Sequence, residues 1–202
     1  MPGKTAFYGT LCHVEASTTT NRYIMLLEAS KLYRAGITAN GVEHFTWSRW
    51  EAIDEIRLAV VVDENVFVEA SHNQILDQSK QEWNTGRGFI DSVMQSEEYN
   101  SFVASQFAKL VNNDFEYIIS ATVADMLMYE SGMDGVMYPP VQAAGDYGMN
   151  VAIRPDVADS KLKLTDVSEM EYVQANGKGQ LKFIRYGIPL EMDNHGVKRW
   201  RY

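Results

Sequence analysis

The chain has 202 residues, of which 46% are hydrophobic and 22% charged, and this size and composition suit one globular domain with a substantial core. Its formal net charge of -9 argues against non-specific binding to nucleic acid, which requires a basic surface, but permits a local basic pocket for a small anion. The single cysteine, Cys12, excludes an internal disulfide and fits a reducing cytoplasm. The N-terminus lacks the apolar run of a signal peptide, and the longest apolar runs are too short to span a membrane. We therefore expect a cytoplasmic protein with no membrane or nucleic-acid partner.

Short apolar runs predict strands in the first part of the chain. The run at 58–62 is continuous and β-branched, which is typical of a buried strand. The polar cluster at 17–21 is predicted to be a loop. The predicted strands are residues 6–11, 23–27, 31–35 and 58–62.

Ser48 and Glu51 stand at the spacing of a capping box, in which a hydroxyl at the start of a helix is followed three residues later by a carboxylate. This spacing predicts a helix from Arg49 to Arg57.

Two amphipathic helices are predicted in the middle of the chain, where apolar residues recur at helical spacing. The first apolar stripe covers residues 103–111, and the second covers residues 119–127 and ends near Gly132. After them, Leu162 and Leu164 alternate with polar residues, which predicts an outer strand.

The C-terminal region is predicted to form a hairpin followed by an irregular cap. The turn is expected at 176–179, because Asn-Gly-Lys-Gly separates two alternating segments. The tail at 191–202 is expected to be irregular. Strands at both ends of the chain with helices between them favour the α+β class.

Several common catalytic and binding motifs are absent from the sequence. It has no GxxxxGK[ST] phosphate loop and no HExxH or CxxC metal spacing, and its four histidines are scattered. The sequence therefore predicts no metal site.

The most informative segment covers residues 132–156, GMDGVMYPPVQAAGDYGMNVAIRPD. It has the order of a helix end, a strand, a stop at Pro139 and Pro140, a loop rich in glycine and alanine, and a strand that begins at Asn150. This order resembles the C-terminal half of RES domains, which show a phrase similar to "DGI-x-YPS", a glycine-containing loop, and an Asn before an apolar strand.

The resemblance implies the fold and activity of that family. It implies an α+β, ADP-ribosyltransferase-like fold with two small mixed or antiparallel sheets and helices between them. We expect one RES-like domain over residues 1–202, in which 168–202 forms a C-terminal hairpin and tail. Some RES domains degrade NAD and act as the toxin of a toxin–antitoxin pair. The resemblance therefore implies an NAD glycohydrolase, an NAD phosphorylase or an ADP-ribosyltransferase, with an antitoxin protein as partner if it is a toxin; a homodimer is left open.

A carboxylate is the central group for cleaving the bond between nicotinamide and ribose. The transition state resembles an oxocarbenium ion, which a nearby carboxylate stabilises. The AIDEIR phrase at 52–57 is similar to the family's "Ala-x-x-Glu-(Val/Leu)-Arg" helix. This resemblance implies that Glu55 is the catalytic carboxylate; the structural alternative is a solvated side chain.

NAD binding also requires an arginine fork for the pyrophosphate and an aromatic face for nicotinamide. In one alignment, Asn21-Arg22-Tyr23 resembles the family's "GRFN/GRWN" phrase and Leu32-Tyr33 resembles its "LY-x-(S/A)" phrase, which implies Arg22 and Tyr33 as ligand residues. In the other alignment, Arg34 is the leading arginine and Phe45 the aromatic. Surface ion pairing of the arginines and core packing of Tyr33 are the structural alternatives. Asn150 matches the position of the family's Asn.

One departure from the family pattern supports a competing hypothesis. Pro140 stands where the family commonly has a serine after "Tyr-Pro", so that no hydroxyl is available there. The alternative is a catalytically degenerate RES-like module that binds a nucleotide or a protein partner. A third hypothesis comes from residues 7–11, FYGTL, which look like the "YGTL" start of γ-glutamylcyclotransferase-type proteins.

Overall fold

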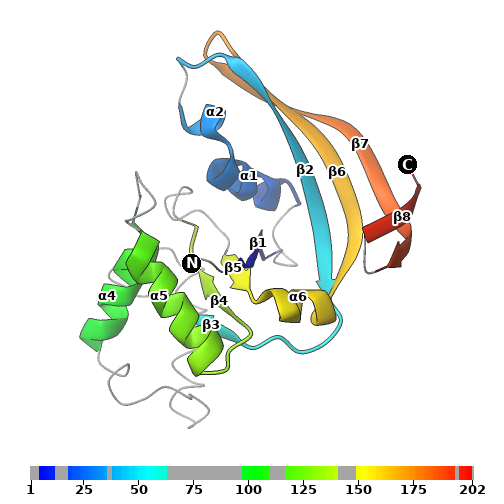
Figure 1. Ribbon diagram of the computed structural model, residues 1–202. Coiled ribbons are helices and arrows are strands. Elements are labelled where there is room, and N and C mark those ends of the chain that lie inside the picture. The colour runs from blue at the N-terminus through cyan, green and yellow to red at the C-terminus, as the bar shows by residue number, and fades with distance from the viewer. Residues whose placement is uncertain are drawn as a thin grey trace. The chain divides into compact units, whose positions relative to one another are not determined.

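The computed structural model describes residues 5–11, 18–35, 38–62, 97–109, 117–140, 149–193 and 196–201. It has mixed α+β structure with two small sheets and a few helices (Figure 1). The chain divides into two compact units, each built from two separate stretches of sequence. Unit 1 comprises residues 1–28 and 56–158, and unit 2 comprises residues 29–55 and 159–202. None of the helices in the described ranges is long and apolar enough to cross a membrane.

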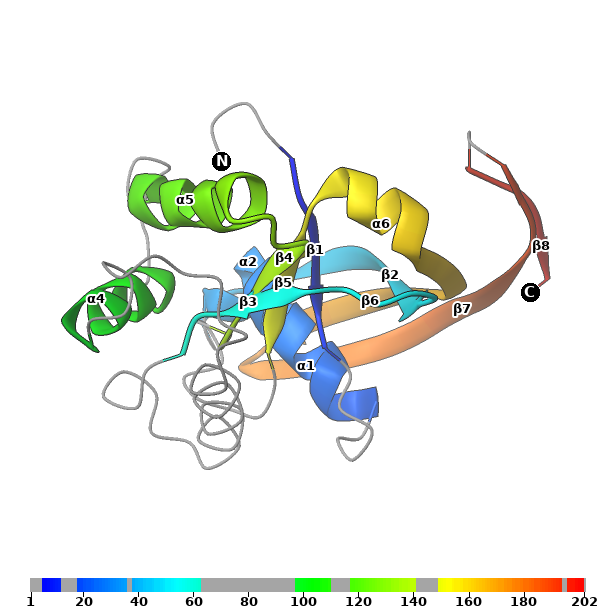
Figure 2. The same ribbon diagram turned by 90° about the horizontal axis from the view of Figure 1, so that it is seen from below.

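Unit 1 contains a four-stranded mixed sheet in the order β1-β5-β4-β3. The pairs β1–β5 and β5–β4 are antiparallel, and the pair β4–β3 is parallel. Figure 2 shows these strands gathered in one sheet. The strands expected near 6–11 and 58–62, and both strands expected in the 132–156 segment, are confirmed. Their bounds are β1 Phe7–Thr10, β3 Leu58–Val60, β4 Gly135–Tyr138 and β5 Asn150–Ile153.

Helices α4 (Glu97–Phe107), α5 (Ile118–Asp125) and the π-helical turn η4 (Met126–Glu130) supply seven of the twelve residues in a core cluster of unit 1. The predicted second helix and its end near Gly132 are confirmed, because Gly132 adopts a left-handed conformation with φ 69°. The first stripe is confirmed as far as Phe107; residues 110 and 111 lie outside the described residues. The core cluster combines sheet and helix residues: Ala59, Val61, Val62, Val103, Ala104, Phe107, Val123, Ala124, Leu127, Met128, Val136 and Met149.

Helix α1 (Thr18–Ala29) corrects two predictions in the first part of the chain. The strand predicted at 23–27 is helical, and most of the loop predicted at 17–21 belongs to the same helix. Ile24 and Leu27 are buried at a spacing of three residues, which also fits one face of a helix. A short apolar run does not distinguish a strand from a buried helix segment, and this explains the error.

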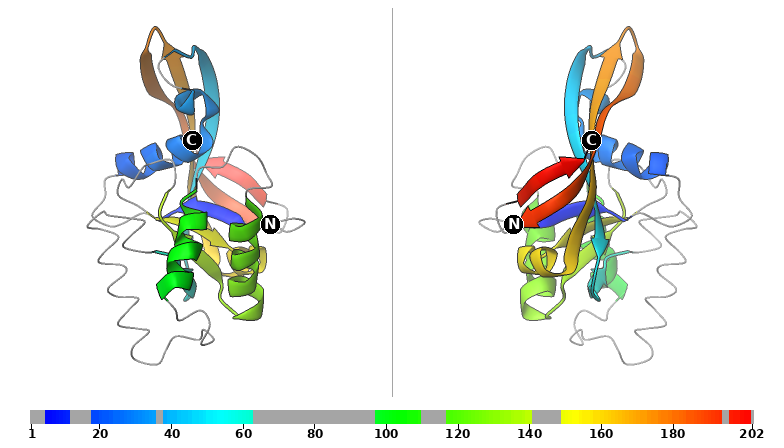
Figure 3. Two further views of the ribbon diagram at one scale, coloured as in Figure 1. Left: turned by 90° about the vertical axis from the view of Figure 1, so that its left-hand side faces the viewer. Right: turned by 90° about the vertical axis from the view of Figure 1, so that its right-hand side faces the viewer.

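Unit 2 contains a four-stranded antiparallel sheet in the order β2-β6-β7-β8. Its three long strands, β2, β6 and β7, run alongside one another in a curved ribbon (Figure 3). The strand predicted around Leu162 and Leu164 is confirmed as β6, but it is not an outer strand, because it pairs with β2 on one side and β7 on the other. The predicted hairpin is confirmed as β6 and β7, joined by Asn176 (φ 52°) and Gly177 (φ 74°). Positive φ at both central residues is the conformation that an Asn-Gly hairpin turn requires. The bounds are β2 Gly41–Ala52, β6 Leu162–Ala175, β7 Lys178–Asp193 and β8 Gly196–Arg201.

The helix predicted at 49–57 is wrong, because strand β2 continues to Ala52 and a bend follows. Ser48 and Arg49 pair with Val167 and Asp166 on β6. The Ser48 hydroxyl accepts a hydrogen bond from Trp50 Nε1 at 2.8 Å. Pairing with a distant strand therefore overrides the local capping signal.

Two other predictions in unit 2 are wrong. Residues 31–34 form the short helix α2 (Lys31–Arg34) and not a strand, because the Ser30 hydroxyl caps it by accepting the Tyr33 N–H at 2.8 Å. The tail at 191–202 is not irregular, since it contains the end of β7 and strand β8. That strand depends on its partner β7.

Helix α6 (Pro155–Lys161) leads from β5 of unit 1 to β6 of unit 2. Proline at the first helical position, Asp156 in the first turn and Lys161 in the last turn are all favourable for a helix.

Candidate functional site

Asn150, the first residue of β5, carries an unused hydrogen-bond donor in the interior of unit 1. Its side chain is 0% exposed. The side-chain Oδ1 accepts a hydrogen bond from the Thr10 hydroxyl at 3.1 Å, whereas Nδ2 is buried and has no hydrogen-bond partner in the part of the chain that the structure describes. A buried donor without a partner costs about 1–3 kcal/mol, so such an atom in a native structure calls for an explanation. One such explanation is that a bound ligand accepts a hydrogen bond from Nδ2.

The sheet register places three more polar side chains beside Asn150. Thr10 on β1 and Tyr138 on β4 are its direct cross-strand partners, so the three side chains share one face of the sheet. Tyr8 lies two residues before Thr10 and points to the same face. The Tyr138 ring packs edge-on against Phe107 of α4 at 5.1 Å between ring centroids. We call Tyr8, Thr10, Tyr138 and Asn150 the hydroxyl cluster.

The two phenols of the hydroxyl cluster are hydrogen bonded and stay neutral at pH 7. Burial raises the pKa of Tyr138 and its hydrogen bond with Tyr8 lowers it; with smaller contributions from Glu28 and Tyr117, which raise it, the pKa is about 12. Although 49% of the Tyr8 side chain is exposed, its hydroxyl lies against that of Tyr138. Burial of this hydroxyl, together with Tyr138 and Glu28, raises the pKa of Tyr8 well above its usual range. Both groups therefore act as hydrogen-bond donors.

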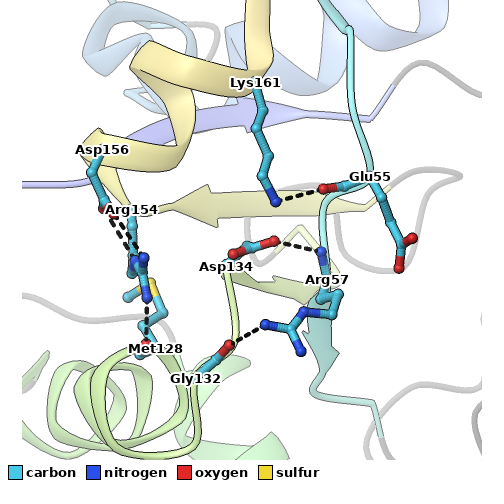
Figure 4. A network of polar contacts seen from close by, with 8 residues as sticks. All are labelled: Glu55, Arg57, Met128, Gly132, Asp134, Arg154, Asp156 and Lys161. Atoms are coloured by element: carbon cyan, nitrogen blue, oxygen red, sulfur yellow. Dashed lines mark hydrogen bonds and ion pairs between the residues drawn. The ribbon is translucent and has the colours of Figure 1, made fainter.

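A second polar network lies at the other end of β4, around Asp134 (Figure 4). The Asp134 carboxylate is 6% exposed and accepts the backbone N–H of Arg57 at 3.0 Å. Its backbone N–H donates to the Arg57 carbonyl at 2.9 Å, and its carbonyl accepts the Arg154 N–H at 2.9 Å. The Arg57 guanidinium donates to the Gly132 carbonyl at 3.0 Å. These bonds hold together the starts of β3 and β4 and the end of β5.

Arg154 extends this network toward the helices. Its guanidinium donates to the Met128 carbonyl at 3.2 Å, makes two bonds to Asp156 at 3.1 and 2.7 Å, and lies 5.8 Å from the centre of the Tyr129 ring. The hydrogen bonds from Arg154 lower the pKa of Asp156, and those to Asp156 raise the pKa of Arg154. Because these donors are satisfied by the protein itself, we assign the network around Asp134 a structural role. The sequence prediction did not identify this network. Arg57 lies in the AIDEIR phrase at 52–57 and Asp134 lies in the segment at 132–156, so the resemblance of these two segments to RES domains could have indicated it.

Glu55 lies in unit 2, in a segment without helix or strand after the bend that follows β2. Its carbonyl accepts a hydrogen bond from Lys161 Nζ at 2.7 Å, and its N–H donates to the Asp54 carboxylate at 2.7 Å. The side chain is exposed, and its carboxylate points away from Lys161 (Figure 4). Among the described residues, this carboxylate has no hydrogen-bond or ion-pair partner. The helix that the resemblance implied around Glu55 is absent.

The two aromatic candidates share one face of the sheet of unit 2. Tyr33 is half-buried, and its ring packs on Tyr172 with the centroids 5.6 Å apart. Phe45 is half-buried on β2 and lies 6.2 Å from Trp47. Phe45 pairs with Met170, which lies two residues before Tyr172 on β6, so the two rings are on the same face. Both rings therefore contribute to packing in unit 2.

The structure describes the two candidate arginines less completely than the two aromatic residues. Arg34 is the last residue of α2 and is exposed. Arg22 lies in α1, and its side chain is outside what the structure describes. Thus Tyr33, Arg34, Phe45 and Glu55 belong to unit 2, and Arg22 and Asn150 belong to unit 1. The structure brings Tyr33 and Phe45 onto one face and surrounds Asn150 with hydroxyls that the sequence prediction did not include.

No group of three or more His, Cys, Asp or Glu side chains in the described ranges is arranged to hold a metal ion. The comparisons do not assign the chain to a family. No protein-family model, no curated protein and no solved structure matches it.

Proposed function

We propose that this chain is a RES-like protein with an ADP-ribosyltransferase-like fold, and that it binds NAD and cleaves the bond between nicotinamide and ribose. The observation that carries the proposal is the unused buried amide of Asn150, at the position that the resemblance assigns to the family's Asn. Asn150 is the first residue of β5, which pairs with β4. It follows a helix end, the short strand β4 and two prolines, which is the order of elements on which the resemblance is based. The unused donor supports a ligand at this position, and the resemblance supplies NAD as that ligand.

Glu55 is the carboxylate that the proposal assigns to catalysis. Its side chain is exposed and has no partner among the described residues, so it is not committed to a structural ion pair. A carboxylate beside the ribose stabilises the positive charge that develops as nicotinamide leaves, and water, phosphate or another acceptor then takes the ADP-ribosyl group. No metal is required for this chemistry.

The test is release of nicotinamide from NAD by the purified chain, with and without phosphate, measured by chromatography. We expect turnover by the wild type and a loss of about 100-fold or more in Glu55→Gln, because removal of one preorganised electrostatic group typically has that effect. Glu51→Gln is the matched control, since Glu51 is also exposed but lies on β2. Absence of turnover by the wild type in both conditions, or equal turnover by Glu55→Gln, would contradict the catalytic proposal.

A second candidate function is a degenerate RES-like module that binds the nucleotide without cleaving it. The observation that favours it is Pro140, which is fully buried where the family commonly has a serine. In that case NAD raises the melting temperature of the chain, by an amount that grows with the logarithm of the NAD concentration above the Kd, but NAD is not consumed. Thermal unfolding with NAD, followed by assay of intact NAD, distinguishes the two functions.

The resemblance also extends the proposal to a toxin with a protein antitoxin. Expression of the chain in a bacterial host is then expected to deplete NAD and stop growth, and Glu55→Gln is expected to do neither. Growth at the wild-type expression level, with unchanged NAD, would argue against a toxin.

A further inference from the structure

We infer that the hydroxyl cluster of unit 1 recognises a phosphate-free, nucleoside-like part of the ligand through acceptor oxygens such as ribose hydroxyl or carboxamide oxygens. This inference rests on the proposed function and specifies which part of the nucleotide the cluster contacts. It assigns binding roles to Tyr8, Thr10 and Tyr138, which the family resemblance does not mark.

The hydrogen-bond directions of the cluster determine what it can bind. The Thr10 hydroxyl donates to Asn150 Oδ1, and this orients the amide so that Nδ2 is the unused donor. The Tyr8 and Tyr138 hydroxyls are hydrogen bonded to each other, which uses one of their two hydrogens and leaves the other as a second donor among the described residues. Asn150 and Tyr138 are direct cross-strand partners, so both donors lie on the same face of the sheet. The complementary ligand group offers one or two acceptor oxygens.

The charge around the cluster disfavours a phosphate. Glu28 acts electrostatically on both Tyr8 and Tyr138 and raises the pKa of each. A carboxylate in this position repels an anionic ligand group but tolerates hydroxyl and amide groups. The donors therefore match the phosphate-free part of a nucleotide better than its pyrophosphate.

Two members of the cluster, Tyr8 and Thr10, lie on an edge strand of the sheet. Tyr8 is 49% exposed there, whereas Asn150 on the next strand is fully buried. Because Tyr8 and Thr10 lie beside Asn150 and Tyr138 on one face of the sheet, both residues are expected to affect binding.

The test is isothermal titration calorimetry of the full chain with four probes: NAD, nicotinamide riboside, adenosine and inorganic pyrophosphate. We expect Asn150→Leu, Tyr8→Phe and Tyr138→Phe, which each remove a donor or the hydroxyl bonded to it, to weaken binding of NAD and of whichever nucleoside the wild type binds by about 5- to 10-fold, as expected for loss of one hydrogen bond. Thr10→Val, which removes the hydroxyl that orients the Asn150 amide, is expected to act in the same direction. Binding of pyrophosphate by the same variants is expected to stay at the wild-type level. Tyr186→Phe is the matched control, because it removes a hydroxyl from an exposed tyrosine of unit 2.

The outcomes separate the two proposals. If Asn150→Leu does not fold, Tyr8→Phe and Tyr138→Phe still give the answer. Wild-type affinities for NAD and the nucleosides in those two variants, or an equal loss of pyrophosphate binding, would overturn the inference while leaving NAD binding intact. If a nucleoside binds with the expected sensitivity and NAD does not bind, the proposed function fails and the hydroxyl cluster stands as a nucleoside site. Absence of binding by NAD and both nucleosides would overturn both.

Discussion

At the scale of single residues, Asn150 and Glu55 show different relations between sequence and structure. Asn150 was expected from its place before an apolar strand, and it is a buried side chain with an unused donor. Glu55 was expected from a helical phrase, and it lies in an exposed segment without helix or strand. A fully buried amide such as that of Asn150 needs a hydrogen-bond partner from the protein or a ligand, whereas water can solvate the exposed carboxylate of Glu55. For this reason Asn150 supports a binding role more strongly than Glu55 supports a catalytic one.

The raised pKa of Tyr138 predicts a loss of stability at alkaline pH. An unfolded tyrosine ionises near pH 10, whereas burial raises the pKa of Tyr138 to about 12 in the folded chain. Between these values the unfolded state loses the proton first, so the free energy of unfolding falls as pH rises from about 10 to about 12. Tyr138→Phe removes this contribution.

Urea unfolding at about pH 9 and at about pH 11 measures this effect. We expect the unfolding midpoint of Tyr138→Phe to decrease less between the two pH values than that of the wild type. An equal decrease in both proteins would show that Tyr138 is not responsible.

At the scale of elements, local sequence patterns predicted the structure correctly where residues within the element itself determine its conformation. The Asn-Gly turn fixes the β6–β7 hairpin, and Gly132 ends the helical segment before β4. Local signals failed where a distant partner decides the conformation. The capping-box residues became part of β2 because β6 pairs with them.

The close packing of β4 against β5 makes Gly135 a test of the unit 1 sheet. A Cβ atom at Gly135 would lie 2.5 Å from the Ala152 carbonyl oxygen and 3.0 Å from Ile153 Cα, which are both backbone atoms. Because the backbone has to move, we expect Gly135→Ala to lower the free energy of unfolding by about 1–3 kcal/mol.

Gly9→Ala on β1 is the matched control for this substitution. Its Cβ would make only ordinary contacts, at 3.6 Å from the Phe7 ring and 3.9 Å from Val151. Chemical denaturation of both variants compares them directly. A loss of stability in Gly135→Ala no greater than that in Gly9→Ala would contradict the close approach of β4 to β5.

At the scale of the whole molecule, each unit is assembled from two stretches that are far apart in the sequence. Unit 2 combines residues 29–55 with residues 159–202, and the intervening residues belong to unit 1. Strand β2 therefore depends on β6, which is made more than one hundred residues later. Such non-local pairing is not encoded in any short window of sequence.

The acidic composition of the chain predicts its solubility behaviour. The sequence pI is about 4.9, and the formal net charge at pH 7 is -9. Because repulsion between molecules is weakest near zero net charge, we expect solubility to be lowest near pH 4.9 and to rise toward pH 7. The protein concentration remaining in solution after centrifugation, measured across this pH range, tests the prediction. A minimum at neutral pH would contradict it and would indicate association driven by apolar surface.

The sequence by itself determined the α+β class, the helix that ends near Gly132, the strands on either side of Pro139 and Pro140, and the C-terminal hairpin. These features depend on apolar periodicity, glycine and proline, which act over a few residues. Only the tertiary structure decided that residues 49–52 extend a strand, that 23–27 and 31–34 are helical, and that the tail adds β8.

The hydroxyl cluster also required the tertiary structure. Thr10 and Asn150 are 140 residues apart in the sequence, yet their side chains are hydrogen bonded across adjacent strands. Asn150 alone could be selected from the sequence, because it precedes an apolar strand. Its partners come from β1 and β4, and only the register of the sheet brings them onto one face, because that register is set by pairing between distant segments.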